Sequence, residues 1–236
     1  MTSTTPILTT NDSAVLQALF DAESSPSGPT INPSLPPFPA HLNITPEDHE
    51  ALQSHQITIL HPLQSPNPDP ETIQTAIKAL DTLIAENPTY PPTYVNRAQA
   101  FRILVDASAE EIEQSTEALT AIFSDLGEAI RLATPPSPAD AVSPVQARVL
   151  AGAHTHQGYL LLRLAKVKRN GGLGPEKWRW ADADRLEEMA SRDFFFGGRF
   201  GNRVAQQLAV QTNPYAKMCA AIVRGALRKE AEGQFI

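Results

Sequence analysis

Small and bulky apolar residues recur along the middle of the chain at a spacing typical of paired helices. The positions are Ala76, Leu80, Leu83, Pro88, Tyr94, Ala98 and Phe101. Offsets of three and four place residues on one helix face, and the proline between the two sets interrupts the helix. Two helices approach closely only where a side chain is small, and an aromatic ring one turn further fills the space beside that notch. The pattern predicts a helix over 71–86, a turn, and a second helix that starts at Pro92.

The same spacing returns further along the chain. The residues are Ile122, Leu126 and Ala129 for one helix and His154, Gly158 and Leu161 for the next. Tetratricopeptide repeats, which are helical pairs of about 34 residues, carry these offsets. Relative to that period, about 12 residues are inserted before Ile122. We therefore expect about three irregular helical hairpins.

Polar caps and prolines mark further helix starts, for example at Thr45-Pro46 and Ser143-Pro144. The expected helices cover about 12–22, 46–60, 71–86, 92 onward, a stretch from Ser108 through 129, 144–169, 176–191 and 202–232. The segments between them are a Ser/Pro-rich linker at 24–39, a proline-rich loop at 61–70 and glycine-rich breaks at 170–175 and 194–201. The predicted fold is all-α: a short α-solenoid of about three irregular tetratricopeptide-type hairpins with a C-terminal capping helix and an N-terminal amphipathic helix on a linker. Residues 1–44 would form the helix and linker, and residues 45–236 the repeat domain.

Composition and charge exclude several classes of protein. The 236 residues carry a net charge of -7, with 4 basic against 18 acidic residues in 1–146 and 15 against 8 in 147–236. Basic residues of the second half alternate with acidic ones and no nucleic-acid motif accompanies them, so we expect no nucleic-acid partner. No apolar run approaches the roughly 18 residues of a membrane helix, and the N-terminus lacks a secretory signal. We expect no membrane partner and a cytoplasmic location, with the nucleus also open.

Three segments together resemble the tetratricopeptide repeat protein 36 family. They are residues 11–20 near the start, 94–99 with 125–130 in the middle, and Asn213-Pro214-Tyr215 with the residues to Cys219 near the end. The resemblance implies a non-catalytic, three-repeat interaction module without a cofactor, with heat-shock chaperones as partners and a link to tyrosine catabolism. By its chemistry, Tyr215 suits packing against the last repeat, because tyrosine favours sites with one apolar and one wet side.

Repeats of this kind bind partners on the concave surface lined by the first helix of each pair. The expected lining residues are Asn96, Gln99, Arg102, Thr155, His156, Tyr159 and Arg163. The carboxylate clamp that grips a chaperone's acidic C-terminus is incomplete, although Asn96 matches its repeat-two asparagine. No lysine precedes Lys78, and the two cationic positions of repeat three fall on Gly152 and His156. We expect a protein partner, and a chaperone only through another surface.

Three functions stay open at this point. The main hypothesis is an adaptor or co-chaperone, and the alternative is a stabilising partner of a metabolic enzyme, suggested by the family link to tyrosine catabolism. The third is a hydrolase with Cys219 as nucleophile and His154 or His156 as base. A lone cysteine beside Met218 and Ala220 is ordinarily a small buried apolar residue. Two histidines two positions apart on a helix point to different faces, so we expect neither catalysis nor a metal site.

An apolar stripe lies in the expected N-terminal helix, at Val15, Leu16, Leu19 and Phe20. It could pack on the repeats of its own chain or bind a groove of another protein. We favour packing within the chain, because an exposed apolar stripe promotes aggregation.

Overall fold

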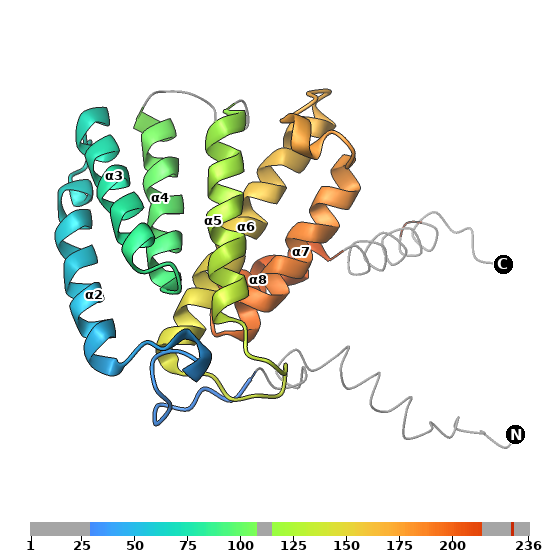
Figure 1. Ribbon diagram of the computed structural model, residues 1–236. Coiled ribbons are helices and arrows are strands. Elements are labelled where there is room, and N and C mark those ends of the chain that lie inside the picture. Colours follow the sequence, from blue (N-terminus) through green and yellow to red (C-terminus); the bar gives the residue numbers. More distant parts are fainter. Residues whose placement is uncertain (1–28, 108–114, 214–227, 229–236) are drawn as a thin grey trace, which may run out of the picture.

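The computed structural model describes residues 29–107, 115–213 and 228. Within these residues the protein is all-helical, as predicted, with one isolated parallel bridge between Ile31 and Val142. The elements are η1 (Ala40–Leu42), α2 (Pro46–Leu60), η2 (His61–Gln64), α3 (Pro70–Glu86), α4 (Pro91–Ala107), α5 (Thr116–Ala133), α6 (Pro144–Arg169), η3 (Glu176–Trp178), α7 (Ala183–Arg199) and α8 (Arg203–Thr212), where η marks a short 3-10 helix (Figure 1).

Helices α2 and α6 begin where the sequence predicts. Thr45 and Ser143 each accept the backbone N–H of the third helical residue, and a proline occupies the first helical position. Both starts are capping boxes, in which the side chain of that third residue bonds back to the cap. Because the first N–H groups of a helix lack partners within it, these caps define where each helix starts.

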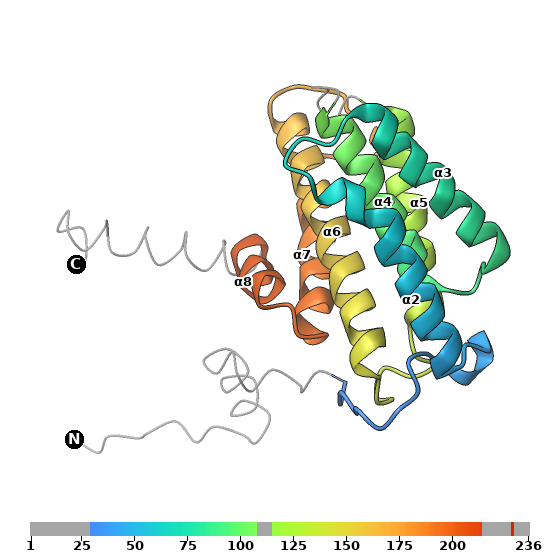
Figure 2. The same ribbon diagram turned by 90° about the vertical axis from the view of Figure 1, so that its left-hand side faces the viewer.

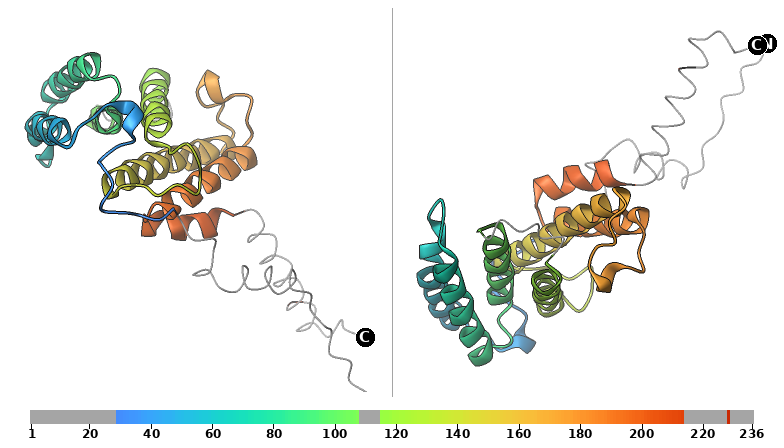
Figure 3. Two further views of the ribbon diagram at one scale, coloured as in Figure 1. Left: turned by 60° about the horizontal axis from the view of Figure 1, so that its bottom comes forward. Right: turned by 90° about the horizontal axis from the view of Figure 1, so that it is seen from above.

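Consecutive helices pack on one another from α3 to α8, and the contact between α6 and α7 is the most extensive. In the view from above, α5 is seen nearly end-on whereas α6 lies lengthwise (Figure 3). Helix α4 also touches α6 directly. In the view that faces α2, helix α6 lies on one side of α2 and helix α3 on the other (Figure 2). Helices α2, α4 and α6 thus come close together although they are not neighbours in the sequence.

The notches predicted from the sequence lie in buried helix contacts. Ala98 is fully buried and Ala76 is 5% exposed. A Cβ atom added to Gly158 on α6 would lie 3.0 Å from the Phe194 ring and 3.1 Å from the carbonyl oxygen of Ala190, both on α7. A larger residue at this position would have to displace Phe194 or helix α7, so glycine favours the close approach of α6 and α7.

Helix α7 differs from its predicted bounds, 176–191, at both ends. It starts only after the capping side chain of Asp182, and it continues to Arg199 through residues expected to form a glycine-rich break. Phe194 is fully buried. A Cβ at Gly197 would meet the Ala205 side chain of α8 at 3.1 Å. The break was predicted wrongly because these aromatic and small residues serve helix packing, which outweighs the weak helix propensity of glycine.

The proline-rich segment before α2 packs against the helices. Phe38 is 1% exposed and meets the rings of His49 and Tyr90 edge-on, with centroid distances of 5.7 Å. The Ser143 hydroxyl donates to the carbonyl oxygen of Pro37 at 2.6 Å. Part of the segment expected as a linker therefore contributes to the core, while the domain division at residue 44 stays a prediction.

Several predicted features lie outside the described residues. These are the amphipathic helix at 12–22, the helix start at Ser108, and Pro214, Tyr215 and Cys219. Helix α8 ends at Thr212, and beyond Asn213 only residue 228 of the predicted helix is described. Among the described helices, none combines the length and the apolar character needed to cross a membrane.

Candidate functional site

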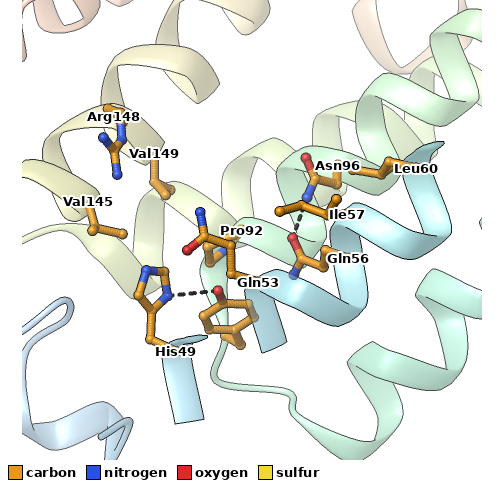
Figure 4. Close-up of a pocket in the computed structure, with 11 residues that line it drawn as sticks. His49, Gln53, Gln56, Ile57, Leu60, Pro92, Asn96, Val145, Arg148 and Val149 are labelled. Atoms are coloured by element: carbon orange, nitrogen blue, oxygen red, sulfur yellow. Dashed lines mark hydrogen bonds between the residues drawn. The ribbon is translucent and has the colours of Figure 1, made fainter. Parts of the chain in front are cut away.

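An open cavity of about 230 Å³ lies between α2, α4 and α6 (Figure 4). Amide, apolar and basic side chains line it: His49, Gln53, Gln56, Ile57 and Leu60 of α2, Tyr90 just before α4, Pro92 and Asn96 of α4, and Val145, Arg148 and Val149 of α6. The first helix of each expected pair therefore contributes to one hollow surface, which we call the groove.

A buried amide network joins α2 to α4 at the back of the groove. Gln56 is 4% exposed, and its Nε2 donates to Thr93 Oγ1 at 2.6 Å. Its Oε1 accepts a hydrogen bond from the Asn96 amide. A buried amide without partners costs about 1–3 kcal/mol, so these bonds hold α2 at a defined distance from α4. The network makes the groove a preformed feature of the fold.

His49 and Tyr90 close the groove at the N-terminal end of α2. His49 Nδ1 lies 2.9 Å from the Tyr90 hydroxyl oxygen, and both residues are buried. Burial, and then the positive charge of Arg148, lower the pKa of His49, while burial raises the pKa of Tyr90. At neutral pH both groups are therefore uncharged. When the Tyr90 hydroxyl donates to Nδ1, the imidazole hydrogen resides on Nε2.

The open side of the groove mixes apolar and polar groups. Ile57 is 57% exposed, and Val145 of α6 faces the same hollow. Gln53 and Arg148 are both exposed and present an amide and a guanidinium there. Such a surface suits contact with another protein, because it offers apolar area together with directional hydrogen-bond groups.

Of the predicted α4 residues, only Asn96 lies in the groove. Asn96 lines the cavity and is engaged by Gln56. Gln99 is exposed, and Arg102 lies further along α4 with its Nη1 3.4 Å from Asp106 Oδ2. Gln99 and Arg102 therefore lie on α4 but do not line the cavity.

His156 of α6 lies near Arg102. Burial, and then the charge of Arg102, lower the pKa of His156 to about 4. Its Nε2 is buried and has no hydrogen-bond partner among the described residues. Tyr159 is 51% exposed one turn further along α6, and Arg163 is partly exposed. Among the predicted α4 and α6 residues, Arg102 is thus close enough to His156 for its charge to act on the imidazole.

Thr155, another predicted residue of α6, faces α7. Its hydroxyl donates to the carbonyl oxygen of Ala151 at 2.6 Å, and a Cβ at Gly197 of α7 would lie 2.7 Å from it. Consecutive residues on a helix point about 100° apart, so Thr155 cannot share the direction of its neighbour His156. The structure places Thr155 against α7 and outside the groove.

Reasoning from the sequence missed the wall formed by α2. His49, Gln53, Gln56 and Leu60 follow one another at offsets of three and four, which is the available signal for one helix face. Polar residues at such spacing are common on solvated helices, so the signal alone does not mark a site. The groove also receives Arg148 of α6, which the prediction omitted.

The histidines considered for catalysis point to different neighbours. His154 Nδ1 lies 2.8 Å from Asp193 Oδ1 on α7, and its ring is near the ring of Phe200, whereas His156 lies near Arg102. Over residues 29–107, 115–213 and 228 there is no group of three or more side chains that could hold a metal ion.

Comparisons with known proteins give one informative match. The chain is 58% identical over 243 residues, covering 97% of this chain and 95% of the relative, to the L-tyrosine degradation gene cluster protein hmgX of Aspergillus fumigatus. No family model matches the chain, and no solved structure matches it.

The expected membership of the tetratricopeptide repeat protein 36 family is therefore wrong, since the relative that matches along almost the whole length has another name. The motifs that suggested it include helix-pair offsets shared by many helical repeats, which carry little information about one family. The chain belongs to the family of the L-tyrosine degradation gene cluster protein hmgX.

Proposed function

We propose that this protein serves L-tyrosine degradation as a non-catalytic partner that binds and stabilises an enzyme of that process. The observation that carries the proposal is the 58% identity, over 97% of the chain, to a protein named for the L-tyrosine degradation gene cluster. Because the similarity extends over 95% of the relative, it concerns the whole protein and not one shared segment.

The groove supports binding as the mode of action. Its back is held by the hydrogen bonds of Gln56 to Thr93 and Asn96, while Ile57 and Gln53 remain exposed at its rim. A preformed surface loses little conformational entropy when a partner binds. The partner enzyme would therefore contact α2, α4 and α6.

The finer architecture belongs to the same proposal: a tetratricopeptide-type solenoid. In support, the sequence offsets at Ala76, Ala98 and Gly158 coincide with close helix contacts, and consecutive helices pack together. Helices α2, α4 and α6 would be the first helices of three pairs, α3, α5 and α7 the second, and α8 the cap.

The other sequence hypotheses gain no support here. A co-chaperone that uses a carboxylate clamp would need cations at Gly152 and His156. Cys219, the nucleophile of the hydrolase hypothesis, lies outside the described residues, and His154 is engaged by Asp193. The cytoplasmic location stays a prediction.

Direct binding to purified enzymes of L-tyrosine degradation tests the proposal. The wild-type full chain is immobilised, and each enzyme is passed over it while binding is recorded by biolayer interferometry. We expect one enzyme to bind, and its melting temperature to rise when the protein is added, since a ligand of the folded state stabilises that state. Failure of every enzyme of the process to bind would overturn the proposal.

A matched pair of variants tests the role of the groove. Ile57 on α2 and Val204 on α8 are 57% and 60% exposed, so an aspartate at either position leaves the core intact. We expect Ile57→Asp to weaken enzyme binding by about tenfold or more, because it places a charge against apolar area of the partner. Val204→Asp should bind like the wild type. Equal effects of the two substitutions would show that the groove is not the binding surface.

A further inference from the structure

Arg148 extends from α6 into the groove (Figure 4). Its guanidinium makes no ion pair and no hydrogen bond with the described part of the chain, in contrast to Arg97 and Arg169, which are paired with acids. Among the described residues that line the cavity, it is the one arginine or lysine, and none of them is Asp or Glu. The described lining of the cavity therefore carries a positive charge and no acidic side chain, while the acid whose charge acts on His49 is Glu50, outside that lining.

Two uncharged donors share this space with Arg148. The Gln53 amide lies in the open part of the cavity, and the second ring nitrogen of His49 is on the side of Val145 and Arg148 (Figure 4). The first ring nitrogen is occupied by the Tyr90 hydroxyl, which fixes the direction of the imidazole. Burial and then the charge of Arg148 lower the pKa of His49, against the opposing charge of Glu50, so its ring is neutral. When the Tyr90 hydroxyl donates to Nδ1, the hydrogen of the ring is on Nε2, which can then donate to a ligand.

We infer that this cavity receives a carboxylate of an extended, acidic peptide segment, with Arg148 as the cation and Gln53 and His49 as further donors. Guanidinium groups bind carboxylates through paired, charge-assisted hydrogen bonds, which are the strongest of the polar contacts. The exposed Ile57 and the nearby Val145 offer apolar area to a neighbouring side chain of the same segment. The inference rests on the proposed function, since the segment belongs to the partner enzyme.

The shape and charge of the site favour a peptide segment. The cavity is open and is lined from three helices, so a chain can enter and leave it along the groove. The whole protein carries a net charge of -7, so an acidic partner is not attracted over long distances. Recognition must come from short-range contacts with Arg148, which fall off within about 8 Å at physiological salt. The carboxylate can belong to an Asp or Glu side chain or to a C-terminus.

Labelled peptide pools test this inference even while the partner enzyme is unidentified. One pool has Glu at its centre, a second has Gln there, and both have amidated C-termini. A third has Gln at the centre and a free C-terminal carboxylate. The other positions are randomised among Ala, Leu, Ser and Val in all pools, and binding to the full chain is followed by fluorescence anisotropy.

We expect the Glu pool or the free-acid pool to bind about tenfold tighter than the amidated Gln pool, and the tighter one identifies the source of the carboxylate. Arg148→Gln should abolish the preference, and Arg148→Lys should restore part of it, since lysine keeps the charge but not the paired geometry. The control is Arg203→Gln, an exposed residue of α8 outside the cavity, which should keep the preference. Equal binding of all pools, or a preference that survives Arg148→Gln, would overturn the inference, as would benzoate binding as tightly as the best pool.

The outcome is distinguishable from that of the proposed function. If Ile57→Asp abolishes enzyme binding while Arg148→Gln leaves it unchanged, the groove binds the enzyme but not through a carboxylate. In that case the proposed function stands and this inference fails. If no enzyme binds but the peptide preference is present, the carboxylate site stands and the proposed function fails.

Discussion

Replacement of Gly158 by alanine tests the helix contact on which the groove depends. The added Cβ would lie 3.0 Å from the Phe194 ring and 3.1 Å from the Ala190 carbonyl oxygen. Carbon atoms pack at about 3.5–4.0 Å, so the ring or helix α7 must shift by several tenths of an ångström. Phe194 is fully buried, which leaves it little space to move.

Two opposing effects determine the size of the change. Alanine favours the helical state over glycine by about 1 kcal/mol. Overpacking of a filled core costs about 1–3 kcal/mol. We therefore expect Gly158→Ala to lower the free energy of unfolding by about 1 kcal/mol, and Gly158→Val, whose methyl groups reach further, to lower it by about 3 kcal/mol or more.

Gly152 provides the matched control in the same helix. A Cβ there would meet nothing within 4 Å, so only the helix propensity changes and Gly152→Ala should raise the free energy of unfolding by about 0.5–1 kcal/mol. Urea unfolding of the full chain, followed by circular dichroism, measures all three variants. If Gly158→Ala stabilises the protein as much as Gly152→Ala does, the contact between α6 and α7 is not close enough to require glycine.

Two further predictions concern buried charged and titratable groups. Asp125 is 3% exposed and accepts hydrogen bonds from Arg97 Nε and Nη2 at 2.9 and 2.6 Å. Because Asp125→Ala leaves the Arg97 charge without this partner, it should lower the free energy of unfolding by about 3 kcal/mol in urea titrations. A loss below about 0.5 kcal/mol would refute a stabilising role of the Asp125–Arg97 pair. His156, with its pKa lowered from 6.5 to about 4, binds a proton more readily in the unfolded state. The wild type should therefore lose up to about 3 kcal/mol of stability from this group as the pH falls from 6.5 to 4, and His156→Gln should flatten that part of the profile of melting temperature against pH. An unchanged profile would mean that His156 titrates normally.

The sequence by itself determined the all-helical fold and several helix starts. Caps such as Thr45 and Ser143 act on the backbone within one turn, so local residues suffice to predict them. The notches at Ala98 and Gly158 were also readable, because the offset of small residues along a helix follows from helix geometry alone.

The bounds of α7 and the packing of the segment before α2 needed the tertiary structure. Gly197 weakens a helix in isolation but allows close approach to α8, and Phe38 fills space beside His49 and Tyr90, far from it in the sequence. Such contacts contribute more free energy than local propensity, and they exist only once the helices are assembled.

The residues of the candidate site were likewise predictable only in part from the sequence. Of the residues that line the cavity, Asn96 was predicted from repeat offsets, whereas Arg148 and the whole α2 wall were not. A helix face is a property of one segment, but a cavity is shared by three segments whose distances and tilts depend on side-chain packing between them. The sequence could therefore indicate which helices line the groove, while only the assembled fold decided which side chains meet in it.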